Sequence, residues 1–80
     1  MEIIIKYDPD LPGKKILLEF LNEKIERLGG DGPWTKYTEG ILKDNEFGLE
    51  NEKKYTVVWE NYTLPYMILD DKNKVCNLNN

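Results

Sequence analysis

The densest set of potential metal ligands lies between residues 8 and 19, which read D-P-D-L-P-G-K-K-I-L-L-E. Asp8, Asp10 and Glu19 take the first, third and twelfth positions of a calcium-binding loop, and a glycine takes the sixth. Pro12 occupies a ligand position, however, and it has no side-chain oxygen. The residues before the loop favour a strand, whereas calcium loops follow a helix. The three acids are therefore a weak metal candidate, and we expect no cofactor.

Nucleophilic catalysis lacks its usual partners in this chain. Cys76 is the only cysteine and there is no histidine, so no imidazole can activate the thiol and no disulfide can form within the chain. We expect Cys76 to be a half-buried structural residue. Carboxylates are plentiful, but an acid–base pair needs a cleft that gives its members two different environments. One small domain offers little room for a cleft, so we expect no enzymatic activity.

Charge and hydropathy exclude further classes of protein. Fifteen acidic residues oppose eleven basic ones, for a net charge of −4, and the excess is spread thinly along the chain. No basic track for a phosphate backbone is present, so we expect no direct contact with nucleic acid. The N-terminal apolar run is too short for a signal peptide, and no segment approaches the length of a membrane span. A cytoplasmic location is expected.

Aromatic residues beside polar loops are the best candidates for a binding surface. The chain has two tryptophans, five tyrosines and two phenylalanines, and tryptophan and tyrosine dominate the energetics of protein interfaces. We assign Trp59 and Tyr66 to the core. Phe47 has two possible roles, because it can either join the surface or pin its own loop. The predicted protein-binding surface consists of Trp34, Tyr37, Asp44, Glu46, Phe47, Glu50 and Tyr62.

The segment 13–28, GKKILLEFLNEKIERL, is predicted to be the helix around which the domain is organised. At 100° per residue its leucines and isoleucines gather on one side and its charges on the other. Asp10 is the expected N-cap, and Gly29 supplies the left-handed residue that ends such a helix. An isolated helix of this length is unstable in water, so a sheet must cover its apolar side.

Strands are predicted on both sides of this helix. Residues 2–7 carry three consecutive isoleucines, which favour an interior strand covered on both faces. Residues 55–59 and 64–69 favour two further strands, and residues 70–73 a hairpin turn before a short strand at 74–78. Residues 34–43 remain open between strand and helix. Residues 44–54 are predicted to be a polar loop or a loosely paired extension, anchored by Phe47 and Leu49.

The segment KKYTVVWENYTLPYMILDDKNKVCNL resembles the meander of small SH3-like barrels in the rhythm of its strands. The resemblance covers about a third of the chain and carries no motif, so it implies no function. All 80 residues are expected to form a single α+β domain. The expected order is β-α-β-β-β-β, in which the helix packs on a mainly antiparallel sheet of four or five strands.

These features favour a small, acidic, non-catalytic protein-binding domain. Its composition is typical of phage- or mobile-element-encoded inhibitors, which antagonise a host protein by occluding a basic site. One alternative is a homodimeric structural or adaptor protein that pairs through the helix shoulder at Ile16 and Phe20; the oligomeric state is left open between monomer and homodimer. A second alternative is a small-ligand or calcium-responsive regulator that uses the loop Asp8–Glu19.

Overall fold

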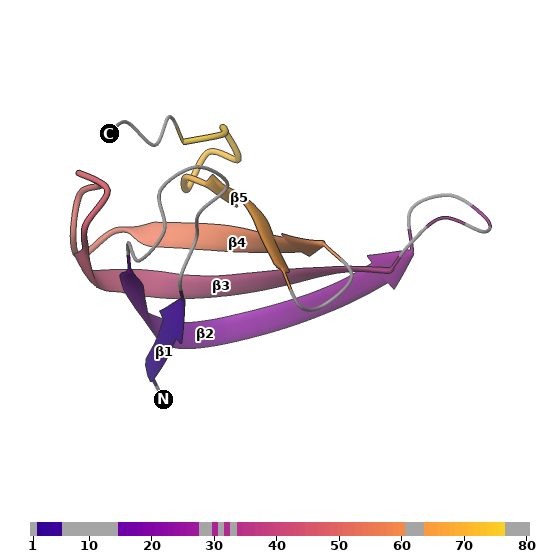
Figure 1. Ribbon diagram of the computed structural model, residues 1–80, viewed down its shortest axis with the longest axis horizontal. Helices are drawn as coiled ribbons and strands as arrows, with labels where there is room; N and C mark the ends of the chain where they lie inside the picture. The colour runs from indigo at the N-terminus through magenta and orange to yellow at the C-terminus, as the bar shows by residue number, and fades with distance from the viewer. Residues whose placement is uncertain are drawn as a thin grey trace.

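The protein is an all-β structure in which five antiparallel strands follow one another in chain order. The computed structural model describes residues 2–5, 15–27, 30, 32, 34–60 and 64–76, with the backbone alone for 60 and 64–66. The strands are β1 (Glu2–Ile5), β2 (Ile16–Arg27), β3 (Trp34–Asn45), β4 (Lys54–Glu60) and β5 (Leu64–Leu69). Figure 1 shows them as a curled half-barrel from which the ends of β2 and β3 project as an arm.

The register explains this shape. β1 covers only the first four residues of β2, from Ile16 to Glu19, whereas β2 and β3 pair along their whole lengths. β4 pairs with the Thr35–Ile41 part of β3, and β5 pairs with the last part of β4. Register shifts interrupt the β2–β3 ladder at two points and the β4–β5 ladder at one. Such bulges bend strands and increase their twist, which curls the sheet.

The core lies on the inner face of the curl. Ile16, Leu18, Leu42, Val57 and Ile68 are fully buried there. The remaining buried members of the cluster, and the partly buried side chains packed against it, are Ile5, Phe47, Tyr55, Ile3, Leu49, Trp59 and Cys76. Every strand contributes, so the sheet closes over itself instead of receiving a helix.

The predicted helix over 13–28, and with it the α+β class, is wrong. Residues 16–27 form β2, the longest strand together with β3, and no helix occurs in the described part of the chain. Asp10 and Gly29, the expected cap residues, lie outside the described residues. Ile16 is fully buried and belongs to the core, so the proposed dimer interface on a helix shoulder does not exist either.

The error has a physical cause. Ile16, Leu18 and Phe20 alternate with period two. The apolar pattern also satisfies the helical template, because one side of a helix would carry Leu17, Leu18, Leu21, Ile25 and Leu28. Pairing with β1 on one side and β3 on the other buries Ile16 and Leu18 completely. Helix propensity differs between residues by only tenths of a kcal/mol, roughly, and such tertiary burial outweighs it.

The other predicted strands are confirmed. β1, β4 and β5 lie where the β-branched and aromatic runs predicted them, and residues 34–45 prove to be strand. β1 is nevertheless at the edge of the sheet, and Ile4 is 69% exposed, so the prediction of an interior strand covered on both faces is wrong. The hairpin turn at 70–73 is confirmed. Of the strand expected at 74–78, residues 74–76 are described, and they form a single bridge between Leu69 and Val75.

Candidate protein-binding surface

The structure divides the predicted surface between the two ends of β3. Trp34 and Tyr37 lie among its first residues, beside the end of β2, whereas Asp44 lies next to its last residue and Glu46 and Glu50 lie in the loop after it. Ten residues of extended chain span about 30 Å, so the two groups cannot contact one compact ligand together. Tyr62 lies outside the described residues.

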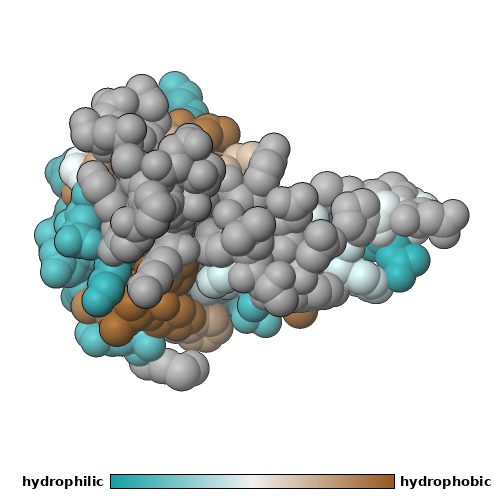
Figure 2. Space-filling model, viewed as in Figure 1, coloured by the Kyte–Doolittle hydropathy of each residue, from teal (hydrophilic) through white to brown (hydrophobic). Residues whose placement is uncertain are grey.

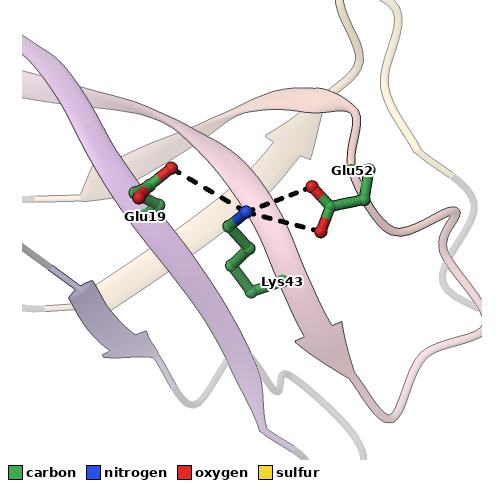
Figure 3. A network of polar contacts seen from close by, with 3 residues as sticks. All are labelled: Glu19, Lys43 and Glu52. Atoms are coloured by element: carbon green, nitrogen blue, oxygen red, sulfur yellow. Dashed lines mark hydrogen bonds and ion pairs between the residues drawn. The ribbon is translucent and has the colours of Figure 1, made fainter.

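Part of the acidic end is neutralised by its own lysines. Lys43 of β3 lies between Glu19 of β2 and Glu52 of the β3–β4 loop, with Nζ–carboxylate distances of 3.9 and 3.1 Å, and Figure 3 shows its amino group pointing at both. The hydrogen bond and charge of Glu52 raise the pKa of Lys43 above its usual value. Glu50 is paired with Lys53 at 3.0 Å. These carboxylates are therefore less available to bind a basic partner than the sequence suggests.

The loop between β3 and β4 is built around Asn45. The side-chain oxygen of Asn45 accepts hydrogen bonds from the backbone N–H groups of Phe47 and Leu49, each at 2.9 Å. Its amide nitrogen donates to the carbonyl oxygen of Leu49 and to the side chain of Asn51. Phe47 is only 6% exposed and belongs to the core. Phe47 thus pins the loop, which is the second of the two roles predicted for it, and it is removed from the candidate surface.

The opposite end of the sheet is organised by a bulge in β2. Leu21 is the extra residue between the pairs Phe20–Gly40 and Asn22–Glu39. A side chain at position 40 would place its Cβ 2.7 Å from the carbonyl oxygen of Glu19, so only glycine permits this close approach of the two backbones. Beyond the bulge, β2 continues as far as Arg27, and its only partner among the described strands is β3.

The outer edge of this part of β2 is open. β1 begins at Glu2, opposite Glu19, and runs toward Ile16; in the described part of the chain no strand pairs with the outer side of Leu21–Arg27. Leu21 and Ile25 are 49% and 47% exposed. Unpaired backbone groups flanked by exposed apolar side chains make a template for another strand. Figure 2 shows a small apolar area on the lower side of the arm, where β2 runs in Figure 1.

Cations lie over aromatic rings along the same end of the sheet. The Arg27 guanidinium carbon is 4.6 Å from the centroid of the Trp34 ring, and Lys36 Nζ is 4.7 Å from that of Trp59. Both pairs are cross-strand partners in the register. Each such contact is worth about 0.5–1 kcal/mol at an exposed site, so the stacked rings hold β2, β3 and β4 in register.

Trp59 is fixed further by its indole N–H, which donates to the Thr38 hydroxyl at 2.8 Å. Thr38 is 2% exposed, so this bond satisfies a buried hydroxyl that would otherwise destabilise the core. The assignment of Trp59 to the core is confirmed, since it packs against the core cluster while only partly buried. For Tyr66 the structure describes the backbone alone.

A shallow hollow of about 430 Å³ lies on the outer face of the sheet. Its charges compensate one another, because Lys24 pairs with Glu26 at 3.4 Å and Lys54 pairs with Glu39 at 3.4 Å. The hollow therefore selects neither an anion nor a cation. Its lining residues are Asn22, Lys24, Glu26, Tyr37, Glu39, Thr56, Leu69 and Asn73.

The metal candidate cannot be assembled from the described residues. Glu19 lies on β2 and not on a helix, and its carboxylate faces Lys43; Asp8 and Asp10 lie outside the described residues. Among the described residues, no group of three or more acidic or cysteine side chains is placed to hold a metal ion. Within the same ranges, no helix is both long and apolar enough to cross a membrane.

The thiol and the buried phenol are both held in their neutral forms. Burial, assisted by the charge of Asp70, raises the pKa of Cys76, and the thiol packs half-buried against the core, as predicted. Burial likewise raises the pKa of Tyr55, whose hydroxyl both accepts from and donates to the backbone of Glu50. A raised pKa lowers the thiolate fraction near neutral pH, which disfavours nucleophilic chemistry at Cys76.

The residues that sequence analysis missed are those of the open edge. The apolar pattern places Leu21, Glu23, Ile25 and Arg27 in a helix, so it does not predict their exposure at the margin of a sheet. The available signal is weak: residues 23–27 alternate charge sign with a single apolar residue among them, a pattern also typical of a solvated helix. Comparison of the chain with protein-family models, curated proteins and solved structures finds no match.

Proposed function

We propose that this chain is a non-catalytic protein-binding domain that takes an extended segment of its partner along the open edge of β2. One observation carries the proposal: among the described residues, Leu21–Arg27 is a strand that pairs on one side only, with Leu21 and Ile25 about half exposed. An extended peptide that joins such an edge gains backbone hydrogen bonds, and its alternate side chains contact the neighbouring faces.

The edge is a better binding surface than the acidic loop. Glu50 and Glu52 already pair with Lys53 and Lys43, and a partner's cations would have to displace those lysines. Phe47, the aromatic residue of the loop, is buried. The edge, in contrast, combines exposed apolar side chains with backbone groups that lack a partner strand in the described part of the chain. The proposal thus keeps protein binding as the function and moves the binding site from the acidic loop to the edge of β2.

A backbone substitution at the edge tests the proposal. In an antiparallel pair the N–H groups of successive residues point alternately toward and away from the neighbouring strand. Lys24 and Ile25 are adjacent, so the N–H of one points toward β3 and the N–H of the other points to the open edge. Of the variants Lys24→Pro and Ile25→Pro, one therefore removes only the N–H at the open edge and leaves the hydrogen bonds between β2 and β3 intact. Thermal unfolding identifies that variant as the more stable of the two. The full 80-residue chain is then used to select binders from a library of displayed seven-residue peptides.

We expect the selected peptides to bind the native chain and to lose about tenfold or more in affinity for the tolerated proline variant, since one hydrogen bond and the strand fit are lost. The matched alanine substitution at the same position keeps the N–H and should bind with nearly native affinity. Equal losses for alanine and proline would show that a side chain, and not the edge, is recognised. If the library yields no binder that depends on the edge, the proposal is wrong.

A further inference from the structure

We infer that the strand that fits this edge best is the same strand of a second copy, so that two chains join β2 to β2 in one continuous antiparallel sheet. The inference rests on the proposed binding edge and names its partner. A closed dimer of identical chains places the same patch on both sides of a two-fold axis. Joining two edges antiparallel requires that axis to stand perpendicular to the sheet, at the centre of the paired segment.

This symmetry restricts the possible registers. The two-fold axis keeps the side chain of each residue and the side chain of its copy on the same side of the joined sheet. Two residues that lie directly opposite each other across the interface must therefore come from the same face of β2. The axis therefore passes beside a single residue, which lies opposite its own copy. An axis at Glu23, Lys24 or Glu26 would place like charges directly opposite each other, and such contacts are unfavourable.

An axis at Ile25 gives a complementary interface. Ile25 then lies against Ile25 of the second copy, and both side chains are 47% exposed in the single chain. On one face Glu23 lies opposite Arg27 of the second copy, and on the other face Lys24 lies opposite Glu26. Each of these opposite-charge contacts occurs twice because of the two-fold axis. Opposite-charge cross-strand pairs contribute favourably, and in this register no like charges face each other.

The shape of the chain admits this arrangement. Ile25 lies six residues beyond Glu19, the last residue of β2 that pairs with β1, which is about 20 Å along the strand. The two strands run in opposite directions from the axis, so the half-barrels lie at opposite ends of the joined arms. Lys24 and Glu26, now paired within one strand at 3.4 Å, are both exposed enough to turn to the second copy.

Charge reversal tests the register. Analytical ultracentrifugation of the native chain should give a mass that rises with concentration from 9.4 kDa toward twice that value. The Glu23→Arg variant places two cations at each two-fold-related contact, and the Arg27→Glu variant places two anions there. Each change should raise the dimer dissociation constant by about tenfold or more. An equimolar mixture of the two variants restores opposite charges at both contacts and should dimerise.

A second pair of variants, Lys24→Glu and Glu26→Lys, reverses charges on the other face of the sheet. Each should weaken the dimer alone, and their mixture should dimerise; neither change alters the Arg27–Trp34 stack. The controls are Lys72→Glu and Asp71→Lys, which change the net charge at an exposed turn outside the interface and should leave the dimer intact. Circular dichroism confirms that every variant is folded.

Three outcomes would overturn the inference: a native chain that stays at 9.4 kDa at millimolar concentration, single reversals that dimerise like the native chain, or monomeric variants whose mixtures stay monomeric. The proposed function fails separately. If the chain is monomeric but peptides bind its edge, the proposed binding edge stands, and only the second copy is excluded as its partner.

Discussion

The two halves of β2 both contain leucine and isoleucine, but these residues lie in opposite environments. The first half, Ile16–Phe20, pairs with β3 and, as far as Glu19, with β1, and it buries Ile16 and Leu18 completely. The second half, Leu21–Arg27, has β3 as its only partner among the described strands and leaves Leu21 and Ile25 about half exposed. Leucine and isoleucine occur in both halves, so the type of a residue does not by itself set its burial. The difference lies in whether a neighbouring strand continues past Glu19, which makes the first half core and the second half an edge.

The largest expected contrast comes from truncating one leucine in each half. Leu18→Ala removes a fully buried side chain and should lower the free energy of unfolding by about 2–5 kcal/mol, because it also leaves a cavity. Leu21→Ala removes a half-exposed one and should cost less than about 1 kcal/mol. Urea denaturation of both variants measures the difference. Equal costs would show that the second half is buried in solution.

The junction of the halves is tested at Gly40, which lies opposite Phe20. In Gly40→Ala the new Cβ would lie 2.7 Å from the Glu19 carbonyl oxygen and 3.1 Å from Leu18 Cβ. The backbones must separate, so the free energy of unfolding should fall by about 1–3 kcal/mol. Gly48→Ala is the control: its Cβ would meet nothing, and only its φ of +80° opposes the change. A loss at Gly40 no larger than that at Gly48 would contradict the close approach of β2 and β3.

The loop that closes the buried half depends on Asn45. Asn45→Ala removes two hydrogen bonds accepted from the backbone and two donated by the amide, and the free energy of unfolding should fall by about 1–2 kcal/mol. Asn22→Ala, on the exposed half, is the matched change and should be nearly neutral. Thermal unfolding compares the two, and a neutral Asn45→Ala would show that the loop holds without this network.

The smallest expected effect concerns the ion pairs of the buried half. Because Glu52 raises the pKa of Lys43 above 10.5, the charged lysine stabilises the folded state below that pH. This contribution is lost as the pH rises through the raised pKa. The difference in unfolding free energy between the native chain and Lys43→Met should therefore be constant below about pH 10 and shrink above it. Urea denaturation across this pH range measures the difference, and a constant difference throughout would contradict the pairing with Glu52.

The sequence by itself determined the local elements whose signals come from neighbouring residues. The β-branched and aromatic runs placed β1, β4 and β5, the Asp70–Asn73 turn marked the end of β5, and the position of Phe47 in a polar segment indicated an anchor for its loop. These are short-range preferences that tertiary contacts reinforce. The absence of histidine and of a second cysteine limited the chemistry without any structure.

Only the tertiary structure decided between helix and strand for residues 16–27, and with that choice the location of the binding edge. The apolar spacing in this segment fits periods of 3.6 and of two, so the local energies are nearly balanced. Pairing with β1 and β3 buries Ile16 and Leu18, and this burial settles the choice in favour of a strand. The register that places Glu2, the first residue of β1, opposite Glu19 is likewise a tertiary fact. In the described part of the chain it leaves Leu21–Arg27 with β3 as its only partner strand.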